Sequence, residues 1–255
     1  MGRTVRIGDS EVTRIGLGTN RLRSSRANRS FLTDAVAVGL RFIDTAHVYT
    51  HGKSERTIGR ALAPFADALV VATKGGYQAG GAGELRADLE QSLERLGVDS
   101  IHLYYLHRVH PSLPVEEAMT VLGEYRDGGR IGHIGVSAVT VEQVEAARAV
   151  VEIAAVQNAY NLGRREHDDV VDYCDREGIV FVPYYPLRDD GPPALPEIAA
   201  RHDATPNQIK LAWLLRRSPL IAPIPGTLSL EHLTENLASL EIELSDDEFE
   251  ELGGS

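Results

Sequence analysis

The sequence has little cysteine, and it has no long apolar segment. Its 255 residues include one cysteine, Cys174, so an internal disulfide is excluded and a reducing compartment is the simplest interpretation. Acidic neighbours would raise the pKa of this thiol, so we expect no catalytic role for it. No run approaches the roughly 18 apolar residues of a membrane span, and the N-terminus lacks the apolar core of a signal peptide. We therefore expect a cytoplasmic protein without a membrane partner.

Positive charge is also scarce. Lys and Arg total 26 against 37 Asp and Glu, which gives a formal net charge of -11. Nucleic acids and anionic membranes need clustered positive charge, so neither is expected as a partner. The 43% hydrophobic and 25% charged residues are ordinary for a globular protein long enough to bury a sizeable core. No low-complexity linker divides the chain, which predicts one domain over residues 1–255.

Short apolar runs recur along the chain with helical segments between them. The runs are TRIGLGT (13–19), RFIDT (41–45), ALVVATK (68–74), IHLYYLH (101–107), HIGVS (133–137), IAAVQNA (153–159), IVFVPYY (179–185) and LIAPIPG (220–226). Runs that are apolar on both faces are typical of buried parallel strands. Eight strand-and-helix units predict an α/β fold of the (β/α)8 TIM-barrel type. A doubly wound sheet is the alternative, but the glycine fingerprint of its dinucleotide sites is incomplete here.

Helix signals fill the intervening segments. ELRADLEQSLERLG places its leucines on one face and ends at Gly97. Thr205 with Gln208, and Ser245 with Glu248, form capping boxes. Ser54 and Thr140 each precede a helical segment and are predicted as further N-caps.

Polar side chains stand at the carboxyl ends of three neighbouring runs. Asp44, Lys74 and His107 end the second, third and fourth runs, and Tyr49 follows in the loop after Asp44. In such barrels the chemistry lies at the C-terminal ends of strands, and adjacent strands are only about 4.8 Å apart. Each residue alone has a structural interpretation, such as a loop cap or a solvated lysine. Together they predict one catalytic cluster.

These four side chains suit acid catalysis at a carbonyl. A free tyrosine has a pKa of about 10, too high for a good proton donor at neutral pH. A lysine cation favours the phenolate and lowers that pKa, and a buried lysine needs a carboxylate such as Asp44. His107 could orient the carbonyl oxygen or relay its proton. Because the cluster holds no obvious nucleophile, a bound cofactor would have to supply a hydride.

The remaining strand ends indicate where a cofactor would bind. Hydrogen-bonding side chains follow strands five and six: Ser137, Gln157 and Asn158. Tyr184 ends strand seven with a ring suited to stacking. Gly226, Thr227 and Ser229 precede a helix after the last strand, and helix N-termini at this place are the usual phosphate site of barrels. Ser229 is equally a plain N-cap, and the two roles are compatible.

Several motifs in family order carry a resemblance to a known superfamily. They are IGLGTN (15–20), FIDTAHVY with G-x-S-E (42–55), ATKGG (72–76), YYLHR (104–108), GVS (135–137), VQNAYN (156–161), YYPL (184–187) and IPGT with HLTEN (224–236). Over nearly the whole chain they resemble the aldo/keto reductases, most closely the bacterial branch whose last strand reads IPGT. The resemblance implies the (β/α)8 fold and reduction of aldehydes or ketones to alcohols with a nicotinamide cofactor.

The resemblance also implies a role for each matching residue. Tyr49 would be the general acid, Lys74 would lower its pKa, Asp44 would hold Lys74, and His107 would orient the carbonyl. Ser137 and Gln157 would hold the carboxamide, Tyr184 would stack on the nicotinamide, and Thr227, His232, Glu235 and Asn236 would bind the adenosine and its phosphates. The complete predicted cofactor set is Gly18, Thr19, Asn20, Asp44, Ser137, Gln157, Tyr184, Pro186, Leu187, Ile224, Gly226, Thr227, His232, Glu235 and Asn236.

Departures from the family pattern bear on the cofactor. Gly226 and His232 stand where many NADPH-binding members have Lys and Arg, and Ala138 replaces an Asn. Two cations for a 2′-phosphate are therefore missing, although the IPGT branch shares this feature and Arg188 could compensate. We predict NADP(H), with NAD(H) as the alternative, a small carbonyl compound as the partner, and a monomer or weak homo-oligomer.

Two other functions are alternatives to a reductase. A cofactor-binding regulatory subunit is one, since potassium-channel β-subunits form a branch of the same superfamily. A metal-dependent barrel hydrolase is the other, prompted by nine histidines. His47 and His51 have i, i+4 spacing but lie in a predicted loop, and no His-x-His ends the first strand, so we predict no metal site.

Overall fold

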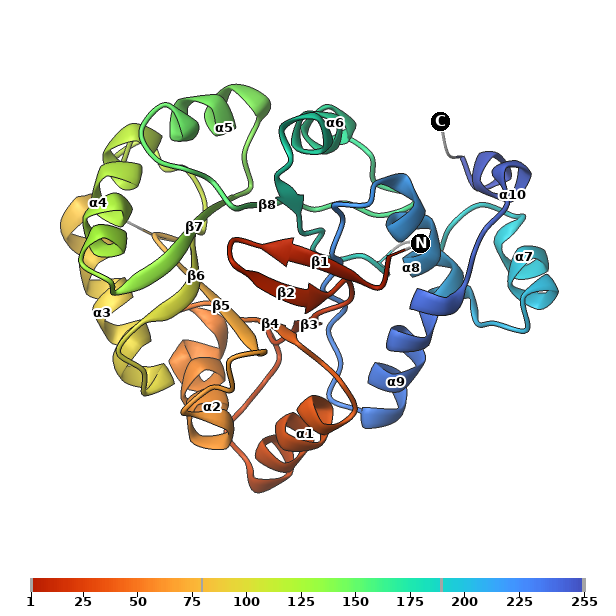
Figure 1. Cartoon of the computed structure of the whole chain (residues 1–255), viewed down its shortest axis with the longest axis horizontal. Coiled ribbons are helices and arrows are strands. Elements are labelled where there is room, and N and C mark those ends of the chain that lie inside the picture. Colours follow the sequence, from red (N-terminus) through yellow and green to blue (C-terminus); the bar gives the residue numbers. More distant parts are fainter. Residues whose placement is uncertain (1, 79, 189, 254–255) are drawn as a thin grey trace.

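A curled parallel sheet forms the centre of the protein. The computed structural model describes residues 2–78, 80–188 and 190–253. Its seven-stranded sheet follows chain order from β3 to β9, with helices around the outside (Figure 1). The strands are β3 (Leu17–Gly18), β4 (Phe42–Asp44), β5 (Val70–Gly75), β6 (Ile101–Leu106), β7 (Ile131–Ser137), β8 (Ala155–Gln157) and β9 (Val180–Phe181).

The segment 220–226 closes this sheet into a barrel. The Ala222 N–H donates to a β9 carbonyl at 2.9 Å, and on the other side the Gly16 N–H donates to the Pro223 carbonyl at 2.9 Å. Pro223 and Pro225 lack N–H groups, so this eighth segment cannot form a continuous ladder. The predicted (β/α)8 architecture is confirmed, with an irregular eighth strand.

Helices follow the strands on the outside of the barrel. They are α1 (Arg26–Ala37), α2 (Lys53–Leu62), α3 (Ala82–Leu96), α4 (Val115–Asp127), α5 (Val141–Arg148), α6 (Asp168–Glu177), α7 (Leu195–Arg201), α8 (Pro206–Arg217), α9 (Leu230–Ala238) and α10 (Asp246–Glu251), with 3₁₀ turns η1 (Tyr49–Gly52) and η2 (Ser239–Glu241). The helix predicted to end at Gly97 is α3, and its leucines are buried. None of the described helices is long and apolar enough to cross a bilayer.

Most of the predicted helix caps are confirmed. Thr140, Thr205 and Ser245 cap α5, α8 and α10, each in a capping box. The prediction for Ser54 is wrong, because α2 begins after Gly52 and Ser54 is buried within its first turn.

Two apolar layers hold the barrel together. One fills its interior with side chains such as Phe42, Leu103, Tyr105 and Val182. The other lies between the sheet and the helices and includes Trp213 and the α3 leucines. The filled interior leaves the carboxyl ends of the strands as the place for a site.

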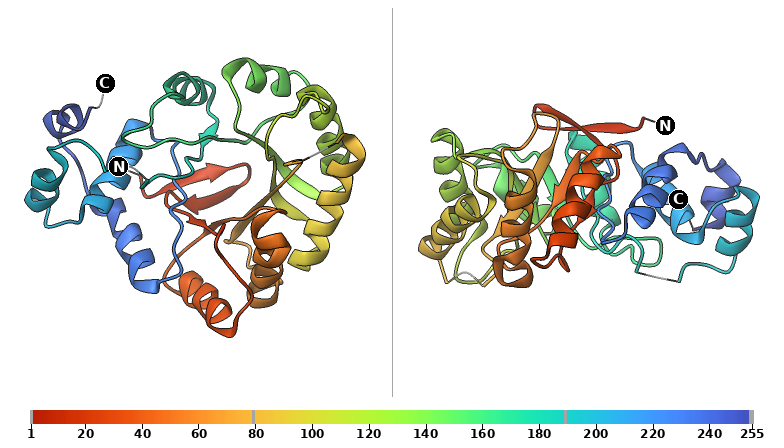
Figure 2. Two further views of the ribbon diagram at one scale, coloured as in Figure 1. Left: turned by 180° about the vertical axis from the view of Figure 1, so that it is seen from behind. Right: turned by 90° about the horizontal axis from the view of Figure 1, so that it is seen from below.

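A β-hairpin that the sequence analysis missed covers the opposite end of the barrel. Strands β1 (Thr4–Ile7) and β2 (Ser10–Thr13) pair antiparallel and lie across the ring (Figures 1 and 2). Ile7 and Val12 are buried against the interior layer. The available signal was Gly-Asp between two alternating stretches, which is typical of a two-residue hairpin turn.

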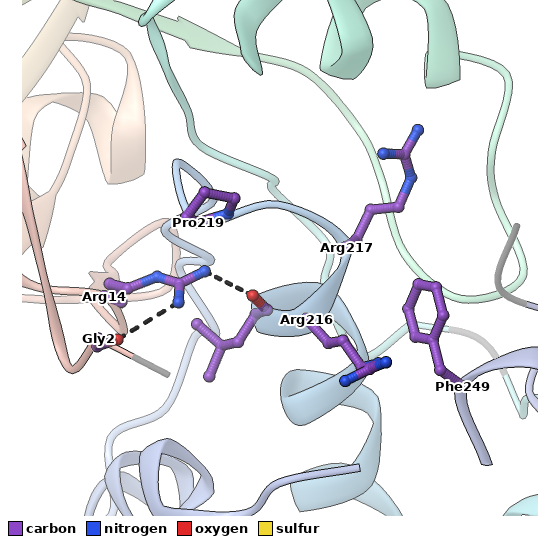
Figure 3. A pocket seen from close by; sticks show the side chains of 7 residues that line it. Gly2, Arg14, Arg216, Arg217, Pro219 and Phe249 are labelled. Carbon is purple, nitrogen blue, oxygen red and sulfur yellow. Dashed lines mark hydrogen bonds between the residues drawn. The ribbon is translucent and has the colours of Figure 1, made fainter. Parts of the chain in front are cut away.

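Arg14 joins this end of the chain to α8. Its guanidinium donates to the carbonyls of Leu215 and Ser218, both at 2.6 Å, and points to the end of α8 beside a cavity of about 370 Å³ (Figure 3). Burial lowers the pKa of Arg14 to about 10, so it stays charged at neutral pH. The carboxyl end of a helix carries partial negative charge, which explains a buried arginine without a carboxylate.

Candidate active site

A buried ion pair lies at the carboxyl ends of β4 and β5. Lys74 Nζ donates to Asp44 Oδ1 at 2.6 Å and to the Thr45 carbonyl at 2.7 Å, and both charged side chains are 1% exposed. The Gln157 amide donates to the other oxygen of Asp44, Oδ2, at 2.9 Å. Both carboxylate oxygens therefore have donors, as a buried charge requires.

Tyr49 is brought over this pair by an unusual turn. Its hydroxyl is 3.4 Å from Lys74 Nζ, which also lies 4.9 Å from the centre of the tyrosine ring. Thr50, His51 and Gly52 follow with φ of 48°, 56° and 75°, three successive residues in the left-handed region. That region is costly for residues with a Cβ, most of all a β-branched one. Strain therefore accompanies the placement of Tyr49.

We predict that Gly52→Ala destabilises the protein by about 1–3 kcal/mol and lowers activity. A left-handed φ costs a residue with a Cβ about 1–2 kcal/mol. The new Cβ would also lie 2.6 Å from the Arg95 guanidinium, which holds the His47 carbonyl at 3.0 Å beside the turn. Urea unfolding and kcat/KM measure the two effects. Gly97→Ala is the matched control, since φ is 70° but no atom lies within 4 Å of its Cβ; equal effects in both variants would contradict a role for Arg95.

Two opposing effects set the pKa of Tyr49. Burial raises it, and the Lys74 cation lowers it without reversing the shift, so the net direction is upward. The sequence indicates the cation but not the desolvation, which depends on burial in the folded protein. Burial disfavours charge on Lys74, but the Asp44 carboxylate and then Tyr49 raise its pKa, so Lys74 is a cation beside a neutral phenol.

His107 is neutral at every working pH. Burial, followed by the charges of Lys74 and Arg108, lowers its pKa to about 2. Its ring meets those of Tyr49 and Tyr77 edge-on, with centroids 6.0 and 4.8 Å apart. A neutral imidazole can donate one hydrogen bond but cannot carry a second proton, which favours orienting a carbonyl over relaying its proton.

One cavity of about 1110 Å³ brings most of the predicted residues together. Those lining it are Gly18, Thr19, Asn20, Asp44, Tyr49, His107, Ser137, Gln157, Tyr184, Pro186, Leu187, Ile224 and Gly226. Lys74 is buried beneath, reached through Asp44 and Tyr49. The geometry thus unites residues from strand ends and loops far apart in sequence.

The four residues predicted at the adenosine lie at or in α9, beyond the lining of this cavity. Thr227 Oγ1 accepts from the Ser229 N–H at 3.0 Å, and Ser229 caps α9 by accepting from the His232 N–H at 3.4 Å. Glu235 accepts from the Thr205 hydroxyl at 2.5 Å, and Asn236 is buried. Thr227 and Ser229 thus have structural roles at the N-terminus of α9, where a phosphate would be favoured, while Glu235 and Asn236 lie in its second half.

Several cavity residues were not predicted. They are Arg21, Val48, Tyr77, Arg108, Val109, Ala138, Tyr185 and Pro225. The Arg108 guanidinium stacks 3.8 Å from the centre of the Tyr77 ring. Arg108 directly follows His107, and that position was the available signal. With Arg21 and Arg188, it gives the cavity three arginines in a chain of net charge -11.

A barrel whose strand ends hold a Lys–Asp pair beneath a tyrosine suits acid catalysis by an oxidoreductase that acts on carbonyl groups. The sequence profile of the Aldo/keto reductase family matches residues 14–191 and 188–254, and the chain belongs to this family. It is an oxidoreductase of the family that acts on carbonyl groups.

Individual relatives agree with this assignment. The chain is 35% identical to pyridoxine 4-dehydrogenase of Escherichia coli, over 98% of this chain and 97% of that protein. It superposes on a thermostable aldo-keto reductase in complex with the inhibitor epalrestat with a TM-score of 0.90 at 33% identity, covering 98% of both chains. An aldo/keto reductase from Klebsiella pneumoniae in complex with NADP and acetate gives 0.89 at 29% identity, covering 99% of this chain and 94% of that one. Family membership argues against the metal-dependent hydrolase.

Proposed function

We propose that the protein reduces small aldehydes or ketones with NADPH and that Tyr49 is the general acid. The observation that carries this proposal is the Asp44–Lys74 pair, buried beneath the Tyr49 hydroxyl at the base of the cavity. The raised pKa of Tyr49 keeps the phenol protonated and able to donate. When the proton leaves, the nearby Lys74 cation stabilises the phenolate that forms.

Asp44 and His107 complete the proposed catalytic group. Asp44 holds Lys74 in place and keeps it charged, since the carboxylate raises the pKa of the lysine. His107 remains neutral and would donate a hydrogen bond to the substrate carbonyl from the side of the cavity facing Tyr49. The two donors would together define where the carbonyl oxygen lies.

The residues of the cavity suit a phosphorylated dinucleotide. Ser137 and Gln157 offer hydrogen-bonding groups to a carboxamide, and the partly buried Tyr184 offers a ring for stacking. Arg21 and Arg188 supply positive charge that anionic phosphates require, in place of the cations absent at Gly226 and His232. Bound nicotinamide supplies the hydride. We propose NADP(H), the cofactor present in the Klebsiella pneumoniae relative.

An aromatic aldehyde is the substrate class that we propose to test first. Tyr77 with Arg108 against its ring, and Tyr185 with Arg188 against its ring, line the cavity, which suits a flat ring with polar substituents. The 35% sequence identity with pyridoxine 4-dehydrogenase adds pyridoxal to the candidate substrates. We also propose that the chain works in the cytoplasm as a single domain, monomeric or weakly self-associated.

The decisive experiment is an assay of NADPH and NADH oxidation with 4-nitrobenzaldehyde, pyridoxal and aliphatic aldehydes. Turnover with NADPH supports the proposal, and Arg188→Ala is expected to raise KM for NADPH more than for NADH. Binding of NADPH by fluorescence without turnover on any carbonyl would favour the regulatory-subunit alternative. Preference for NADH would contradict the cofactor assignment alone.

We predict that kcat/KM for reduction is independent of pH from about 6 to 9. Tyr49 is the active acid while protonated, and its raised pKa extends this state above its ordinary value of about 10. His107 is neutral above about 2 and does not titrate in this range. Activity should therefore decline only at higher pH. A pH–rate profile with a midpoint between about 6 and 8 would assign the proton to another group.

A further inference from the structure

Three potential metal ligands converge at the hairpin end of the barrel. Asp9 lies in the β1–β2 turn, His102 at the start of β6 and His133 near the start of β7. Asp9 Oδ1 is 3.2 Å from His133 Nε2 and 3.8 Å from His102 Nε2. All three ligand atoms lie within 4.8 Å of one another. The hairpin turn and two barrel strands thus present one carboxylate oxygen and two imidazole nitrogens to the same point.

The hairpin turn is shaped to make this approach. Gly8 has a φ of 61°, and a Cβ there would lie 2.1 Å from His133 Nε2. The Asp9 N–H lies 3.3 Å from the same nitrogen and donates to it. The Ser10 hydroxyl donates to Asp9 Oδ1 at 3.2 Å and helps to orient the carboxylate. Glycine at position 8 therefore lets the turn contact the imidazole directly.

The three side chains also make hydrogen-bond contacts. His133 Nε2 lies 3.2 Å from Asp9 Oδ1, and His102 Nε2 lies 3.5 Å from the Ile7 carbonyl oxygen. When each imidazole carries its proton on Nδ1, both Nε2 lone pairs and the Asp9 carboxylate can serve one cation. A metal ion would then replace the Asp9 N–H as the partner of His133 Nε2 and the Ile7 carbonyl as the partner of His102 Nε2.

We propose that Asp9, His102 and His133 bind a divalent transition-metal ion, with zinc the best match. Bonds of about 2.0–2.1 Å in a tetrahedral site place ligand atoms about 3.4 Å apart. Asp9 Oδ1 is already 3.2 Å from His133 Nε2 and 3.8 Å from His102 Nε2. Two nitrogens and one carboxylate favour zinc over magnesium or calcium, which prefer all-oxygen sites. Asp9 is 79% exposed, which leaves the fourth position to water.

This site is separate from the catalytic cavity and has a different purpose. His102 and His107 lie at opposite ends of β6, as do His133 and Ser137 on β7. The metal would join the hairpin turn to two barrel strands, so its expected effect is on stability rather than on chemistry. The inference therefore stands whether or not the proposed reductase activity is found.

The test uses the full chain without a histidine tag, dialysed against a chelator and titrated with zinc sulfate by calorimetry. We expect one zinc per chain and a rise in Tm of about 5 °C or more at 100-fold excess over Kd. Cobalt(II) should give the intense visible bands of a tetrahedral site with nitrogen ligands. Absence of a stoichiometric site in the wild-type protein would overturn the proposal without any variant.

Three variants locate the ion. Asp9→Asn, His102→Asn and His133→Asn should each weaken zinc binding at least 10-fold and lower the Tm rise at the same zinc concentration by about half or more. His167→Asn is the matched control, because His167 is as exposed as His133, at 26%, and Asn also serves at an N-cap. Asp9→Asn alters only an exposed turn, so it keeps the test valid if a histidine variant misfolds. Unchanged affinity in Asp9→Asn and in the correctly folded histidine variants would place the zinc elsewhere and refute the assignment.

Discussion

Tyr49→Phe is expected to lower kcat/KM for carbonyl reduction by about 10²–10⁴-fold, the usual contribution of a general acid. The substitution removes the hydroxyl that lies 3.4 Å from Lys74 Nζ and keeps the ring. It removes the acidic hydroxyl next to the buried cation. His107 is a neutral imidazole with a single N–H, which is a much weaker acid than a phenol. Steady-state NADPH oxidation measures the loss, and NADPH fluorescence titration should show a Kd within about threefold of wild type.

Tyr185→Phe is the control for Tyr49→Phe. Tyr185 also lines the cavity, but its side chain is exposed and its ring contacts Tyr184 and Arg188 rather than Lys74. We expect less than a tenfold change in kcat/KM for this variant. If Tyr49→Phe kept more than a tenth of wild-type activity, a water molecule or His107 would have to supply the proton, and the assignment of Tyr49 would be wrong.

Asp44→Asn is expected to destabilise the protein by about 3–5 kcal/mol and to abolish measurable turnover. The change leaves Lys74 as a buried cation, 1% exposed, without its carboxylate partner. The Gln157 amide would also face an amide where it now donates to Asp44 Oδ2. Urea denaturation gives the stability change, and the pKa of Lys74 should fall because its main counter-charge is gone.

A double variant separates stability from catalysis. Asp44→Asn combined with Lys74→Met removes both charges, so most of the lost stability should return while activity remains absent. Glu90→Gln is the surface control, since the Glu90–Arg130 pair is about half exposed and should contribute less than about 1 kcal/mol. A double variant as unstable as Asp44→Asn alone would show that the cost lies in packing and not in the unpaired cation.

The sequence predicted the barrel and most of the site because both depend on local, repeating signals. Apolar runs at regular spacing identified the strands, and the residue at each carboxyl end had to lie at the barrel mouth once the order was known. Asp44, Lys74 and Tyr49 could therefore be placed together before any contact was seen. Thr140, Thr205 and Ser245 were found as caps for a similar reason, since a capping box occupies only four successive residues.

The predictions that failed depend on distant parts of the chain. Ser54 was predicted to cap α2, but its hydroxyl instead forms hydrogen bonds with Thr45 Oγ1 at 2.8 Å and Thr19 Oγ1 at 2.9 Å. The hairpin was missed because its packing across the end of the barrel opposite the cavity cannot be seen in the sequence of either of its strands. Arg21, Tyr77 and Arg108 were missed because cavity lining is decided by loops that meet only after folding.

By itself the sequence determined the α/β barrel and the acidic charge of the chain, and it placed the four residues proposed for catalysis at the carboxyl ends of the strands. Only the tertiary structure decided the protonation states, raising the pKa of Tyr49 and lowering that of His107 to about 2. It also decided that Asp9 meets His102 and His133. Strand order follows from patterns along the chain, whereas a pKa or a ligand set is fixed by burial and by distances of a few ångströms between residues far apart in sequence.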